Sequence, residues 1–147
     1  MMPEDRTIAV TRSDLSTDLA AELVGNAVAE ARRLGVNICA VVVDSAGLPL
    51  ATLRMNGVSE MIVDFATDKA KTAATFRRAT DEMRDRLGAD HLWLGASSRT
   101  NLMLWGGGLP LFHQDQCIGS IGVSGALVQQ DIQCAEAALA ASGLQQG

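Results

Sequence analysis

The 147 residues are enough for one domain with a substantial core, and a hydrophobic content of 48% excludes a disordered chain. The net charge of −5, with no basic cluster, argues against nucleic acid and against an anionic membrane surface as partners. Aromatic side chains make up 3% of the chain and tyrosine is absent, so we expect no base-stacking surface.

The first helix is expected from about residue 15 to residue 34. A capping-box pattern at residues 11–14 precedes Leu15, and apolar residues then recur every four positions as far as Ala31. Gly35 is a natural residue to end the helix, because glycine adopts the left-handed conformation easily. The pattern predicts an amphipathic helix with one face toward the core.

Two strands should follow as an antiparallel hairpin. Residues 36–43 are apolar at both alternating positions, which is typical of a strand covered on both faces. Residues 44–47 have turn composition, and residues 48–55 read as the second strand. The short link between the two strands favours antiparallel pairing.

The middle of the chain should be helical and then irregular. A helix is expected after Ser59, with a buried apolar stripe that starts at Ile62 and contains alanines suited to close packing on a sheet. Thr80 is expected to cap a short helix that ends near Gly88. An irregular excursion should follow through residues 97–98.

The last third should contain three strands and a closing helix. The strands are expected over residues 101–105, 109–113 and 117–123, and the helix over residues 127–142. Clustered strands with helices between them predict an α+β fold with a largely antiparallel sheet. We therefore expect residues 1–147 to form a single domain.

Glycine is concentrated near these last strands. Six of the fourteen glycines fall between residues 105 and 125. Glycine lets another backbone or a ligand approach closely. One interpretation is a pocket wall that ends at the start of the last helix, where backbone N–H groups can hold an anion. The other is a sheet packed tightly against helices of small residues, and both stay open.

Cysteine usage and the N-terminal residues indicate a cytoplasmic protein. The three cysteines are far apart and form no CxxC pair, which is typical of reduced, buried thiols. The first residues lack the basic region and apolar run of a signal peptide, and no apolar stretch is long enough to span a bilayer.

Several motifs occur in an order and at spacings shared with a known family. They are Ala40-Val41-Val42-Val43-Asp44 with Gly47, Arg54-Met55-Asn56-Gly57, Lys69-Ala70-Lys71-Thr72-Ala73, Gly107-Gly108-Leu109-Pro110, Ile118-Gly119-Ser120-Ile121-Gly122-Val123-Ser124-Gly125, and Gln130-Asp131 with Ala135. Over about residues 13–143 the chain resembles the GlcG/HbpS-type haem-binding family, which also occurs as the C-terminal domain of PduO proteins.

The resemblance implies a GlcG-like fold with a five-stranded antiparallel sheet, and assembly into homo-oligomers from dimers to octamers. Some members of the family bind haem or relate to cobalamin use, and others occur beside glycolate or small-acid metabolism without an assigned activity. One departure concerns Asn56, where members usually carry aspartate. A carboxylate is lost at that position, which puts any role for it as a base or ligand in doubt.

The first functional hypothesis is a small-ligand-binding protein that holds haem or another tetrapyrrole at the glycine-rich strands. Haem iron needs an axial ligand such as His, Met, Cys or Tyr. His113 is the first candidate for the iron ligand, and His91 is the second. The structural alternatives are that these histidines lie on the surface and that the methionines lie in the core. The residues expected around the cofactor are His113, Met55, Gly107, Gly108, Gly122 and Ser124.

The alternative is a cofactor-independent enzyme of the isomerase or lyase type, acting on a small carbonyl or carboxylate compound. In it Arg54 clamps a carboxylate, Lys69 stabilises charge or acts as a base, and Asp68 and Asp131 are the acids or bases. Each residue also has a structural interpretation. Arg54 can form an ion pair, Asp131 can favour the dipole of the last helix, and Ser124 can be its N-cap.

A third hypothesis is a non-catalytic oligomeric module. In it the surfaces rich in alanine and glycine form contacts between subunits. A closed interior, with no pocket between the strands and the last helix, would support it.

Overall fold

Five helices and one antiparallel sheet make up the computed structural model, which describes residues 6–89 and 91–145. In chain order the elements are α1 (Thr17–Leu34), β1 (Cys39–Asp44), β2 (Pro49–Arg54), α2 (Glu60–Phe76), α3 (Thr80–Ala89), α4 (Trp93–Ser97), β3 (Gly108–His113), β4 (Gln116–Ser124) and α5 (Val128–Ala141). The four strands pair in the order β2-β1-β4-β3. The predicted α+β fold with an antiparallel sheet is confirmed.

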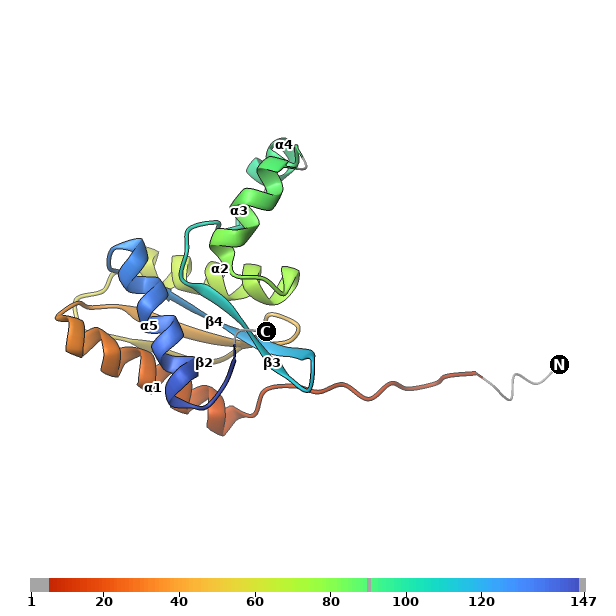
Figure 1. The fold of residues 1–147 in the computed structure, drawn as a ribbon, viewed down its shortest axis with the longest axis horizontal. Helices are drawn as coiled ribbons and strands as arrows, with labels where there is room; N and C mark the ends of the chain where they lie inside the picture. The colour runs from red at the N-terminus through yellow and green to blue at the C-terminus, as the bar shows by residue number, and fades with distance from the viewer. Residues whose placement is uncertain (1–5, 90, 146–147) are drawn as a thin grey trace.

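Helices cover both faces of this sheet (Figure 1). The helices α1 and α5 pack side by side on one face, and α2 lies across the other. β1 is buried on both faces, as its sequence predicts, because Val42 contacts the core under α1 and α5 while Val41 contacts α2. α3 and α4 extend away from the sheet.

The first helix starts later than the sequence predicts. Ser16 is the N-cap, and its hydroxyl accepts a hydrogen bond from the backbone N–H of Leu19 at 3.2 Å. The predicted capping box at residues 11–14 is wrong, because the carboxylate of Asp14 instead accepts a bond from the backbone N–H of Ser45 at 2.7 Å. The end of the helix at Gly35, in the left-handed conformation, is as predicted.

The predicted strand over residues 101–105 does not form, so the sheet has four strands and not five. Side chains of α2 and α3 form hydrogen bonds with backbone groups of this segment. The hydroxyl of Thr72 accepts from the N–H of Met103 at 3.1 Å, and the hydroxyl of Thr80 donates to the carbonyl of Trp105 at 2.7 Å. Groups bonded in this way are not available to a strand ladder.

Two glycines of the last strands are explained by close packing of α2 on the sheet. A Cβ at Gly122 would lie 2.6 Å from the backbone nitrogen of Ala70, and a Cβ at Gly108 would lie 2.6 Å from the carbonyl oxygen of Lys69. At these two positions the structure supports the interpretation of a sheet packed tightly against a helix.

Three residues separate the end of β4 from the start of the closing helix. Its N-cap is Leu127, whose backbone N–H donates to the side chain of Gln130 at 3.1 Å. The interpretation of Ser124 as the N-cap is therefore wrong. Ser124 is the last residue of β4 and is buried.

Candidate functional site

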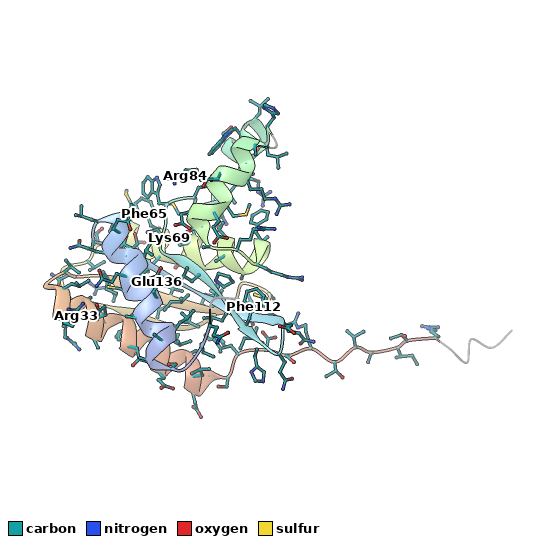
Figure 2. All side chains as sticks on the ribbon, viewed as in Figure 1. Arg33, Phe65, Lys69, Arg84, Phe112 and Glu136 are labelled. Carbon is teal, nitrogen blue, oxygen red and sulfur yellow. The ribbon has the colours of Figure 1, made fainter. Side chains whose placement is uncertain are left out.

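A buried ion pair joins α2 to α5 near one end of the sheet. Lys69 is 1% exposed and Asp131 is 2% exposed. Nζ of Lys69 donates to Oδ2 of Asp131 at 3.2 Å and to the backbone carbonyl of Val123 at 2.8 Å. Figure 2 shows Lys69 and Phe65 close to the start of α5. Two of the four residues predicted for an enzyme site are thus in direct contact.

Burial shifts both members of the pair toward their neutral forms. Desolvation lowers the pKa of Lys69 and raises the pKa of Asp131, while their mutual attraction opposes each change. The backbone N–H of Ala126 donates to Oδ1 of Asp131 at 3.0 Å and favours the charged carboxylate. The neutral and charged forms of the pair are therefore closer in free energy than they would be in water.

Gly107 makes room for the amine. Its φ of 122° lies in the region that favours glycine, and a Cβ there would lie 3.1 Å from Nζ of Lys69 and 3.2 Å from Cβ of Asp131. This glycine, unlike Gly108 and Gly122, contacts a pair of charged side chains. A Cβ there would also lie 2.5 Å from the carbonyl oxygen of Val123, so only glycine allows this close packing against the pair.

A cavity of about 320 Å³, called the lysine cavity below, opens onto this pair. Its walls are mainly apolar and come from the first turns of α2, the end of β4 and the start of α5. The lining residues are Ile62, Phe65, Lys69, Trp105, Ser124, Gly125, Ala126, Val128 and Asp131. A cavity does lie where β4 ends beside the start of α5. The binding of an anion by backbone N–H groups there stays a prediction.

A second cavity of about 450 Å³, called the Met103 groove, lies between α3, α4 and the segment that leads to β3. It is lined by Arg84, Trp93, Ala96, Ser97, Arg99, Leu102, Met103, Leu104 and Trp105. Trp93 is 46% exposed and Trp105 is 54% exposed, so the groove presents large aromatic surfaces. Such surfaces in a concave site favour a flat apolar ligand.

Arg54 and Asp68 lie outside both sets of lining residues. Arg54 is on the edge strand β2, where its guanidinium donates to the backbone carbonyl of Val58 at 2.9 Å. Asp68 is half-buried, and its pKa is raised by burial, against the attraction of Lys71. The structure does not bring these two residues to the Lys69–Asp131 pair.

The predicted haem ligands are also placed apart from the cavities. His113 is the last residue of β3 and is exposed. Gly108 is the first residue of the same strand, and the usual rise of a strand places the two about 16 Å apart. Phe112, its neighbour, is labelled far from Lys69 in Figure 2. The sulfur of Met55 accepts a hydrogen bond from the backbone N–H of Ile38 at 3.3 Å. His91 is exposed.

Sequence reasoning missed the Met103 groove. Met103, Arg84 and Arg99 were not among the predicted site residues. One signal was available, because the only two tryptophans of the chain, Trp93 and Trp105, flank Met103 in sequence and line the same groove.

Within residues 6–89 and 91–145, the structure places no three His, Cys, Asp or Glu side chains so that they could hold a metal ion. No helix in this part of the chain has the length and apolar character needed to cross a bilayer.

A family model described as "Haem degrading protein HbpS-like" matches residues 15–140. The chain belongs to the HbpS-like family. The resemblance indicated by the sequence motifs is confirmed.

Two protein relatives illustrate the breadth of HbpS-like sequences. The chain is 37% identical over 114 residues to a 15.0 kDa protein from the dhaT-dhaS intergenic region of Citrobacter freundii, a match that covers 75% of this chain and 80% of that protein. It is 33% identical over 122 residues to the corrinoid adenosyltransferase PduO of Salmonella typhimurium. That match covers 82% of this chain and only 36% of PduO.

Two solved structures share the HbpS-like fold. A PduOC–haem complex superposes with a TM-score of 0.84 at 31% identity, over 90% of this chain and 98% of that one. A crystal structure of HbpS superposes with a TM-score of 0.83 at 27% identity, over 91% of this chain and 94% of that one.

Proposed function

We propose that the protein binds haem or another tetrapyrrole in the Met103 groove. The observation that carries this proposal is the placement of Met103 in a groove lined by two half-exposed tryptophans and two arginines. The family description and the haem complex of a structural relative support haem as the ligand.

The residues of the groove fit haem in three respects. The thioether of Met103 is a known type of axial ligand for haem iron. The rings of Trp93 and Trp105 offer apolar surface to a flat macrocycle. Arg84 and Arg99 are positioned along the same groove and can pair with the two propionate carboxylates.

A haemin titration of the purified protein, followed by the Soret band, tests this proposal. The wild type should give a saturable, shifted band. Met103→Leu keeps the volume and apolar character of the side chain but removes the sulfur, so the band should shift or weaken. Met61→Leu, on an exposed methionine of α2 outside the groove, is the matched control and should behave as the wild type.

The same titration discriminates between the candidate ligands. His113→Ala should leave the band unchanged if Met103 holds the iron. A band that responds to His113→Ala and not to Met103→Leu would move the haem site to the end of β3. Absence of a saturable band in the wild type would contradict haem binding.

Haemin dimethyl ester tests the role assigned to the arginines. Exposed charge pairs contribute about 0.2–1 kcal/mol each, so the wild type should prefer haemin to its ester by a few-fold. The double variant Arg84→Gln/Arg99→Gln should lose this preference. A preference that persists in the double variant would contradict propionate binding by these two residues.

A further inference from the structure

The Lys69–Asp131 pair has no part in the proposed haem groove, yet it forms the polar end of a separate apolar cavity. We propose that this cavity binds a small carbonyl compound with an apolar substituent, and that the amine of Lys69 forms an imine with it. Trp105 also lines the Met103 groove, but the test of this site uses no haem and does not rest on the function proposed above.

The charges in the cavity favour a neutral ligand over an anion. Lys69 already has a counter-ion in Asp131, at 3.2 Å. A bound carboxylate would add a second negative charge to an apolar site with no further cation among the lining residues. An aldehyde or ketone brings a polarised carbonyl without a charge, and its substituent can contact Phe65, Ile62 and Val128.

The surroundings of Nζ suit amine chemistry. An ammonium has three donors, and two of them are directed to Asp131 and to the carbonyl of Val123. Lys69 and Asp131 are both among the residues that line the cavity, so a ligand bound there lies beside the nitrogen. Desolvation favours the neutral amine, which is the nucleophilic form, as in other lysines that form imines in apolar pockets.

The step balances with Asp131 as the only proton carrier. The carboxylate takes a proton from the ammonium, and the free amine attacks the carbonyl carbon. Asp131 gives that proton to the new alkoxide and takes a second proton from the nitrogen, which leaves a neutral carbinolamine. Asp131 then gives the second proton to the departing hydroxyl, the carbon–oxygen bond breaks and water leaves. The product is an iminium on Lys69 with the Asp131 carboxylate as its counter-ion, so net charge is unchanged and no oxidant or reductant is required.

Reductive trapping tests the proposal on the full chain. The folded protein is incubated with benzaldehyde and cyanoborohydride, and the modified residue is located by peptide mass spectrometry. The chain has two lysines, Lys69 and Lys71, which lie on the same helix, so Lys71 is an internal control. We expect one benzyl group on Lys69, dependent on cyanoborohydride, before Lys71 or the N-terminal amine is modified.

Two variants test whether the adduct forms inside the cavity, and neither of them changes Lys69 or Asp131. Val128→Trp fills the mouth at an exposed first residue of α5 and should abolish the adduct on Lys69. Val10→Trp makes the same change on an exposed residue far from the cavity in sequence and should leave it intact. Modification of Lys71 or the N-terminus alone, or an adduct on Lys69 that is unaffected by Val128→Trp, would overturn the proposal.

Discussion

Trp105 packs edge-to-face against Phe65, with ring centroids 5.4 Å apart and an interplanar angle of 84°. Phe65 lines the lysine cavity, and Trp105 lines both that cavity and the Met103 groove. The two sites therefore share one aromatic wall. Substitutions of Met103 or Val128 should act on one site each, whereas a substitution of Trp105 should affect both.

Removal of one member of the buried ion pair should destabilise the fold. Lys69→Met leaves the Asp131 carboxylate buried without a counter-charge, which should lower the free energy of unfolding by about 3–5 kcal/mol. The double variant Lys69→Met/Asp131→Asn should recover much of the loss. Lys71→Met is the matched control, with an effect within about 0.5 kcal/mol in denaturant unfolding. Equal stability of Lys69→Met and Lys71→Met would contradict this account.

The cost of Lys69→Met should depend on pH. Burial raises the pKa of Asp131 in the folded state, and loss of Lys69 removes the attraction that lowers it. The folded variant then binds this proton more tightly than its unfolded chain does. Its stability deficit relative to the wild type should be largest above the folded pKa and shrink as pH falls toward the unfolded value of about 3.9. A stability deficit of Lys69→Met that grows as pH falls would contradict this prediction.

Gly122→Ala should force α2 away from the sheet. The new Cβ would lie 2.6 Å from the backbone nitrogen of Ala70, which is a backbone clash that no side-chain rotation relieves. A loss of at least about 1–3 kcal/mol is expected from overpacking. At Gly25, inside α1, a Cβ would meet no described heavy atom within 4 Å, so Gly25→Ala should stabilise the protein by about 0.5–1 kcal/mol. Thermal unfolding should show a lower melting temperature for Gly122→Ala and a higher one for Gly25→Ala than for the wild type.

Thr80 holds the segment that carries Trp105. Its hydroxyl donates to the carbonyl of Trp105 at 2.7 Å and accepts from the N–H of Gly108 at 3.1 Å. Thr80→Val leaves both backbone groups without this partner, at a cost of about 1–3 kcal/mol, and should weaken haemin binding by loosening Trp105. Thr75→Val removes only an exposed bond to the carbonyl of Lys71 and should change neither stability nor binding noticeably. Unaltered haemin affinity in Thr80→Val would separate Trp105 from the haem site.

The three cysteines should differ in reactivity. Burial raises the pKa of Cys39 and of Cys134 to about 11, so both are thiols at neutral pH. Cys117 is only half-buried, near the exposed β3–β4 turn. Iodoacetamide should modify Cys117 in the folded protein and all three cysteines in denaturant. Mass spectrometry that finds Cys39 modified in the folded state would contradict the burial of β1.

Local patterns predicted most elements of this fold. The continuous apolar run of β1 and the position of Gly35 each reflect a conformational preference of the local residues. Neither depends on contacts with residues distant in sequence. The segment over residues 101–105 was misjudged because its backbone bonds go to the side chains of Thr72 and Thr80, more than twenty residues earlier. A segment whose backbone groups are hydrogen-bonded to side chains cannot pair with a neighbouring strand, even where its residue pattern is that of a strand.

The candidate sites were less accessible to sequence reasoning for a similar reason. Lys69 and Asp131 were both predicted as functional residues, but their contact depends on how α2 and α5 pack at the end of β4. Arg54 and Asp68 have equally suitable chemistry, yet they lie outside the residues that line the lysine cavity. The Met103 groove exists only because the fold brings Trp93, Trp105 and Met103 to one cavity.

The crystal structure of the protein with haemin tests the central claim most directly. We expect electron density for the macrocycle in the Met103 groove, with the sulfur of Met103 on the iron and the rings of Trp93 and Trp105 against the porphyrin. Arg84 and Arg99 should face the propionates. Haem held through His113 at the far end of β3, with the Met103 groove empty, would contradict it.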